Sequence, residues 1–156
     1  MYDRLIQIGL TPAKSLTLGP ILVPDEFVVD FFRGCIDGDG SIVTYTDRYN
    51  TFKKPQYVYT RLYVSLVSAS PKFLVWLRAT VRRLTRCSGY LNVRRSPPHS
   101  DVWCLKYAKA EALVLLRWMY YAPDVPCLQR KREIAAPLMI RRERPAGRRP
   151  GRPMVV

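Results

Sequence analysis

The stretch that decides the fold is F-R-G-C-I-D-G-D-G at residues 32–40. It closes a largely apolar, helix-forming run at residues 27–32 with two aspartates interleaved with glycines. Because glycine adopts the left-handed backbone that ends many helices, we expect the helix to stop here. Asp39 would then lie just beyond a helix C-terminus, which carries a partial negative charge. A carboxylate in this position is unfavourable for stability, but it is well placed to hold a divalent cation. The alternative is a helix C-cap followed by an ordinary Asp-Gly turn.

Hydrophobic periodicity predicts the other elements. We expect strands at 41–47, 56–67, 90–95 and 102–107, and helices at 2–8, from 24 or 25 into the motif, and at 71–84, 108–121 and 128–136. From residue 25 to residue 121 the order is α-β-β-α-β-β-α, and the helix at 128–136 follows it. This order predicts an α+β domain with helices on one face of an antiparallel sheet and a polar, exposed opposite face.

The nine residues resemble the signature L-A-G-L-I-D-A-D-G of the LAGLIDADG homing endonucleases. Phe32, Arg33 and Cys35 replace its first Leu, its Ala and its second Leu. Only Arg33 differs sharply in chemistry, and it requires a place at the edge of the helix packing face. The resemblance implies a saddle-shaped sheet lying in the DNA major groove and a symmetric dimer through the motif helices. It covers roughly residues 25–136.

Composition agrees with a nucleic-acid partner. The chain of 156 residues carries 26 basic and 12 acidic residues, a formal net charge of +14. This charge favours a polyanion, but it does not separate a nuclease from a ribosomal protein or a repressor. The absence of a long apolar run or an apolar signal core predicts a soluble, intracellular protein, cytoplasmic or organellar, with no membrane partner. The four cysteines are far apart, which favours buried thiols over a zinc site or disulfides.

The resemblance places the metal-binding acid at Asp39, with the carbonyl of Gly38 as an additional ligand. It implies Mg²⁺ as the cofactor, with Ca²⁺ or Mn²⁺ substituting in vitro and no other small-molecule cofactor. Mg²⁺ would polarise the phosphate and help to generate hydroxide. Asp37 is expected to have a structural role at the helix end.

Two further residues are candidates for the catalytic site. Lys131 lies in P-C-L-Q-R-K-R at residues 126–132, which resembles the family's basic segment whose lysine is near the scissile phosphate. The alternatives are a solvated basic face, or Arg130 or Arg132 in the same role. Ser68 ends the second predicted strand, where a polar side chain would reach the water and metal network. For Ser68, and for Ser70 after it, a turn or N-cap role is the alternative.

The exposed sheet face is expected to read DNA bases. By strand alternation its candidates are Tyr45, Asp47, Tyr59, Arg61, Tyr63, Ser65, Asn92, Arg94 and Asp101. A mid-helix glycine costs about 0.5–1 kcal/mol relative to alanine. We therefore expect Gly34 to serve a close helix–helix approach, and the resemblance implies that two motif helices meet there, with Phe31 and Cys35 at the same interface. The alternative is that Gly34 is a tolerated local weakness. One motif per chain implies a homodimer, because cutting two strands needs two acidic centres.

Other nuclease chemistries do not fit. The single histidine, His99, lies in a Pro-rich loop and excludes HNH and His-Cys box sites. There is no G-I-Y and Y-I-G pair, and neither Pro-Asp pair is followed by a suitably spaced (D/E)-x-K.

The two ends are expected to lie outside the endonuclease domain, which we place at 25–137. Residues 138–156 carry six arginines and one acid, which predicts a disordered, phosphate-attracting tail. Its R-P-G-R-P at residues 149–153 is loosely similar to an AT-hook. Residues 1–24 form an extension and linker. Residues 1–18 resemble the segment that ends the first repeat of two-repeat members, with Lys14 as the counterpart of Lys131, and the alternative is an extension wrapped over the core.

The sequence thus predicts a homing endonuclease that takes part in intron homing. It would make a Mg²⁺-dependent double-strand break in a long, pseudo-palindromic DNA site and leave short 3′ overhangs. The alternative is a non-cleaving binder on the same fold, either an intron RNA maturase or a transcriptional regulator.

Overall fold

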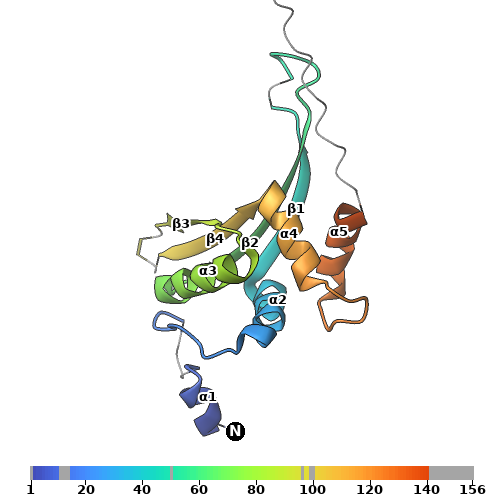
Figure 1. The fold of residues 1–156 in the computed structure, drawn as a ribbon. Coiled ribbons are helices and arrows are strands. Elements are labelled where there is room, and N and C mark those ends of the chain that lie inside the picture. Colours follow the sequence, from blue (N-terminus) through green and yellow to red (C-terminus); the bar gives the residue numbers. More distant parts are fainter. Residues whose placement is uncertain (1, 11–14, 50, 96, 99–100, 141–156) are drawn as a thin grey trace, which may run out of the picture.

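The computed structural model describes residues 2–10, 15–49, 51–95, 97–98 and 101–140. Its elements are α1 (Tyr2–Gln7), η1 (Asp25–Phe27), α2 (Val28–Asp39), β1 (Gly40–Asp47), β2 (Tyr59–Ser68), α3 (Pro71–Thr85), β3 (Tyr90–Arg94), β4 (Val102–Ala108), α4 (Lys109–Met119) and α5 (Gln129–Ile140) (Figure 1). The predicted α+β class and element order are confirmed. No helix in these described ranges has the length and apolar character to cross a membrane.

Two strand or helix ends differ clearly from the prediction, whereas most of the others agree with it to within two residues. β2 begins at Tyr59 rather than at residue 56, although alternation extends further toward the N-terminus. α5 continues to Ile140, so it crosses position 138, where we expected the tail to begin. The remainder of the expected tail, residues 141–156, lies outside the described residues.

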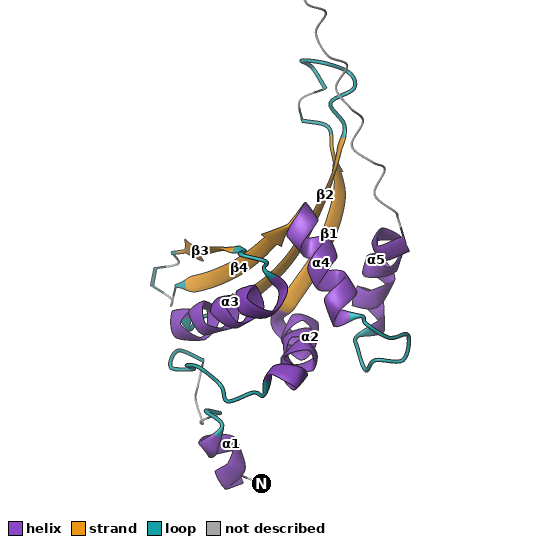
Figure 2. Cartoon of the chain, in the orientation of Figure 1, coloured by secondary structure: helices purple, strands orange, loops and turns teal. Residues whose placement is uncertain are grey.

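The four strands form one antiparallel sheet in the order β1-β2-β4-β3 (Figure 2). β1 and β2 pair from Gly40 opposite Leu66 to Asp47 opposite Tyr59, and they continue as a hairpin beyond the other strands. Because side chains alternate along a strand, this register assigns every second residue to the helix-covered face. Its buried members include Ile42, Leu62, Val64, Leu66 and Leu105.

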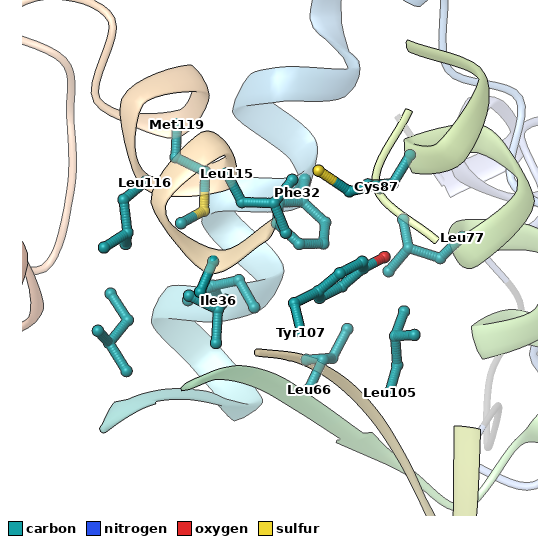
Figure 3. Close-up of a cluster of buried hydrophobic side chains, with 14 of the residues drawn as sticks. Phe32, Ile36, Leu66, Leu77, Cys87, Leu105, Tyr107, Leu115, Leu116 and Met119 are labelled. Atoms are coloured by element: carbon teal, nitrogen blue, oxygen red, sulfur yellow. The ribbon is translucent and has the colours of Figure 1, made fainter. Parts of the chain in front are cut away.

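The core lies between this face and helices α2, α3 and α4 (Figure 3). α2 contributes Phe32 and Ile36, both at most 1% exposed. The ring of Phe32 meets Tyr107 edge-on, with centroids 6.3 Å apart. Gly89 has a left-handed φ of +54°, and a Cβ there would lie 2.6 Å from the ring of Tyr107. Packing and backbone conformation therefore both require glycine at this turn.

The N-terminal extension covers part of the core. Its side chains Leu10, Leu18, Ile21 and Val23 pack against the buried cluster. The hydroxyl of Ser70 donates to the carbonyl of Leu18, which ties the extension to the start of α3. These contacts agree with the alternative of an extension wrapped over the core. Lys14 lies outside the described residues.

Candidate functional site

The motif helix ends differently from the prediction. Asp39 is the last residue of α2, and Gly40 leaves the helix with an extended backbone at φ −92° and ψ 175°. The expected left-handed glycine end is therefore wrong. Glycine is needed at position 40 for another reason, because a Cβ would lie 2.6 Å from the Cα of Ile36 and 2.8 Å from its carbonyl oxygen. The chain passes directly from helix to strand, so Asp39 lies where the sheet begins.

The surroundings of Asp39 leave oxygen donors open. Both Asp39 and Gly38 are exposed, and a Cβ built on Gly38 meets no atom within 4 Å. Burial, and then the charge of Asp39, raise the pKa of the Cys35 thiol to about 12, so this thiol stays protonated and neutral. The accessible donors are thus carboxylate and carbonyl oxygens, the hard ligands that Mg²⁺ and Ca²⁺ prefer.

One chain supplies only part of a metal site. Across the described residues, no group of three or more His, Cys, Asp or Glu side chains is placed to hold a metal ion. Mg²⁺ is often bound by one or two carboxylates together with substrate phosphates and waters. The oxygen donors around Asp39 are therefore suitable ligands for Mg²⁺, provided that a second carboxylate and a substrate phosphate supply the remaining ligands.

Lys131 reaches the same helix end from α5, but it points at the backbone. The side chain is buried, and its ammonium donates to the carbonyls of Ile36, Asp37 and Gly40, with 2.9 Å to Asp37 and 2.7 Å to Gly40. Burial and then Arg130 lower the pKa of Lys131, and the charges of Asp37 and Asp39 oppose that shift. The alternative of a solvated basic face is wrong for this residue.

Its basic neighbours do not make these contacts. Arg130 is exposed, whereas Arg132 donates to the carbonyl of Ala122 at 3.4 Å. Lys131 is therefore the basic residue of this segment that meets the end of α2.

Asp37 makes the reciprocal contact. Its Oδ2 accepts a hydrogen bond of 2.9 Å from the backbone N–H of Leu128, the residue before α5. Its Oδ1 is buried without a hydrogen-bond partner among the described residues. This contact is structural, as expected for Asp37.

We expected Arg33 at the edge of the helix packing face. The structure shows instead that Arg33 is buried, with only 4% of its surface exposed. Its guanidinium donates to the carbonyls of Met119 and Pro126, both at 2.8 Å, and pairs with Asp30. Burying an arginine requires that its donors find acceptors, and the end of α4 and the α4–α5 connection supply them. The charged residue in the motif thus anchors the connection to α5, which the sequence did not indicate.

Ser68 shares a cavity with Asp39. The cavity, of about 560 Å³, is bordered by residues of α2, β2 and the N-terminal extension, including Leu18 and Cys35. The hydroxyl of Ser68 also accepts a hydrogen bond of 3.1 Å from the backbone N–H of Ser70. The structure therefore supports the turn role, and the catalytic role of Ser68 stays a prediction.

The exposed sheet face collects most of the predicted DNA-contacting residues. The register assigns the following eight to it: Tyr45, Asp47, Tyr59, Arg61, Tyr63, Ser65, Asn92 and Arg94. Asp101 does not belong to this set. It precedes β4 and shares the alternation of Trp103 and Leu105, which face the core.

Contacts between neighbours organise this face. Arg61 pairs with Asp47 at 2.8 Å, and its guanidinium lies 5.6 Å from the ring centroid of Tyr59. The N–H of Tyr49, and then Arg61, hold the pKa of Asp47 below its usual range. Lys106 lies on the same face, with its ammonium 3.8 Å from the ring centroid of Tyr63. Sequence reasoning missed Lys106, although the alternation of β4 could have identified it.

The expected dimer-interface residues differ in their surroundings. Gly34 is exposed, and a Cβ there meets no atom within 4 Å, so nothing within the chain requires glycine at this position. Phe31 is half-buried and packs edge-on against Phe73 and Trp76 of α3. The homodimer stays a prediction.

Comparison with known proteins identifies the fold. No protein-family model and no curated protein matches the sequence. The fold matches the solved structure of "Archaeal Intron-encoded Homing Endonuclease I-Vdi141I Complexed With DNA" with a TM-score of 0.50 and 14% identity, covering 71% of this chain and 64% of that chain. The homing endonuclease I-CvuI in complex with the I-CreI target has a TM-score of 0.47 at 20% identity, covering 74% and 65%, respectively. The homing endonuclease I-TnaI has a TM-score of 0.46 at 19% identity, covering 71% and 65%.

These alignments span less than two thirds of the length of the matched chains, 64% to 65%. At such low identity the likeness concerns the fold alone. The chain therefore has the α+β fold, with its four-stranded antiparallel sheet, that is found in the homing endonuclease I-Vdi141I.

Proposed function

We propose that this chain is a LAGLIDADG-type homing endonuclease. Acting as a homodimer, it makes a Mg²⁺-dependent double-strand break in a long, pseudo-palindromic DNA site and leaves short 3′ overhangs. The observation that carries the proposal is the exposed carboxylate of Asp39 at the junction of α2 and β1, where the polar face of the sheet begins. The shared fold with an endonuclease solved in complex with DNA supports it.

The sheet face has the chemistry to bind DNA. Arg61, Arg94 and Lys106 supply positive charge among tyrosines, and arginine can read guanine in the major groove. The formal net charge of +14 adds a general attraction to phosphates. The pairing with Asp47 offsets part of the charge of Arg61, so this guanidinium contributes less than its full charge to the face.

Asp39 and the Gly38 carbonyl would hold Mg²⁺. When bound, this ion polarises a phosphoryl oxygen and lowers the pKa of water. The protein's own task is to place the carboxylate at the DNA surface. Each copy contributes one Asp39, so two copies joined along the open Gly34 face of α2 would provide an acid for each strand.

The test is an Asp39→Asn variant, which keeps the shape of the side chain but removes the charge. We expect cleavage in Mg²⁺ to fall by several orders of magnitude, whereas specific binding in Ca²⁺ is retained. Asp124→Asn is the matched control, because Asp124 is an exposed acid in the α4–α5 connection, and it should cut as the parent does.

Cleavage of a selected site should be measured beside a mobility shift on the same DNA. If Asp39→Asn cuts as fast as the parent, Asp39 is only a turn residue and the proposal fails. If the parent cuts no site in a randomised or genomic library while it binds structured RNA tightly, the maturase alternative replaces it.

A further inference from the structure

Helices α2 and α5 hold each other at the point where the motif ends. The carboxylate of Asp37 in α2 accepts the N–H of Leu128 just before α5. In return, Lys131 from the first turns of α5 reaches three carbonyls at the end of α2 and the start of β1. Each helix thus satisfies backbone groups that the other leaves open, because terminal N–H and C=O groups lack partners within their own helix.

The geometry of Lys131 is that of a helix cap. An ammonium has three N–H donors and no acceptor, and each donor has a carbonyl here. A cation at a helix C-terminus also lies at the favourable end of the helix dipole. Any contact of this ammonium with a phosphate or a water would require it to give up one of these bonds inside a buried site.

The three carbonyls bracket the candidate metal ligands. They belong to Ile36 and Asp37 on one side of Gly38 and Asp39, and to Gly40 on the other. A helix end without such partners frays, and an exposed carboxylate in its last turn would then sample many directions. Fixing the backbone on both sides of Asp39 limits the directions in which its carboxylate can point.

We propose that Lys131 and Asp37 are positioning residues that fix the backbone around Asp39, and that Lys131 acts through this backbone rather than on the phosphate or the attacking water. The inference replaces the direct catalytic role expected for Lys131. The test of this inference by DNA cleavage rests on the proposed function, whereas its test by amide hydrogen exchange does not.

The first experiment measures amide hydrogen exchange of residues 36–41 in the full chain without metal or DNA. Lys131→Met removes the three donors and keeps the apolar stem, and we expect exchange in this segment to rise about tenfold or more, with α3 unchanged. Arg130→Met is the matched control, since it removes the same charge from an exposed neighbour and should leave the segment as in the parent. Asp37→Ala should raise exchange in the same segment. If Lys131→Met does not fold, Asp37→Ala replaces it in this exchange measurement and in the Mg²⁺ titration described next.

The second experiment separates positioning from chemistry by titrating Mg²⁺ in the cleavage assay. A looser Asp39 binds the ion more weakly, so Lys131→Met should need about tenfold more Mg²⁺ for half-maximal cleavage and recover much of the rate at saturation. Because both residues act on one junction, Lys131→Met and Asp37→Ala combined should have less than the summed effect.

Unchanged exchange at 36–41 in Lys131→Met would overturn the inference. A maximal rate that collapses at saturating Mg²⁺, with an unchanged Mg²⁺ requirement, would overturn it as well and return Lys131 to the chemical step. If the parent cuts no DNA, the proposed function fails, and the exchange measurement still decides whether Lys131 and Asp37 fix this segment.

Discussion

Three glycines of the motif region meet different demands. Gly40 is required by the chain's own packing, because a Cβ at this position would overlap the backbone of Ile36. Gly34 and Gly38 have open space around them and sit one helical turn apart on α2. A glycine that the single chain does not need lowers its stability, which favours a role for these two outside the isolated chain.

Alanine substitution separates these demands. Gly40→Ala should lower the free energy of unfolding by about 1–3 kcal/mol, since the new Cβ would lie 2.6 Å from the Cα of Ile36 and backbone cannot move aside cheaply. Gly38→Ala is the matched control and should stabilise the dilute chain by up to about 1 kcal/mol. Urea unfolding measures both. A Gly40→Ala variant as stable as the parent would show that the helix–strand junction has room that the structure does not indicate.

At the scale of elements, we propose that the polar face of the sheet is the recognition surface. On β1 and β2, Arg61 is partly neutralised by Asp47. Asp47→Asn should free this guanidinium, so that DNA binding tightens and the slope of log K against log salt steepens by about one phosphate contact. Asp101→Asn removes an equal charge next to β4 but off this face, and it should change the slope less. Equal effects of the two variants in salt-titrated binding would mean that the sheet face is not the DNA surface.

The strands and helices could be predicted from the sequence where they depend on the local alternation of apolar and polar residues. Alternation correctly assigned Arg61, Tyr63 and Ser65 to the exposed face. In a strand with one buried face, apolar and polar residues alternate along the sequence, so the sequence itself indicates which side chains are buried. The roles of Arg33 and Lys131 could not be predicted in this way. Their acceptors lie 86 to 95 residues away along the chain, and only the packing of α4 and α5 on α2 brings them together.

For the whole molecule, the proposal requires two copies. The parent should sediment near twice its 18.1 kDa, and Gly34→Leu should separate the copies, because a large side chain on the open face would block a second helix. The fold of each copy should survive, since no atom lies within 4 Å of the added Cβ. Analytical ultracentrifugation with circular dichroism checks both. A parent that is monomeric and still makes double-strand breaks at low concentration would contradict the dimer.

The most direct test of the central claim mixes the parent with Asp39→Asn at constant total protein, in excess over a cleavable DNA. After subunit exchange, an equal mixture should make double-strand breaks at about one quarter of the parent rate if both carboxylates of a dimer are required. The rate should follow the square of the parent fraction, provided that both proteins bind the DNA equally in Ca²⁺. A rate that falls in simple proportion to the parent fraction would show that each chain acts alone, and would contradict an endonuclease built from two Asp39 carboxylates.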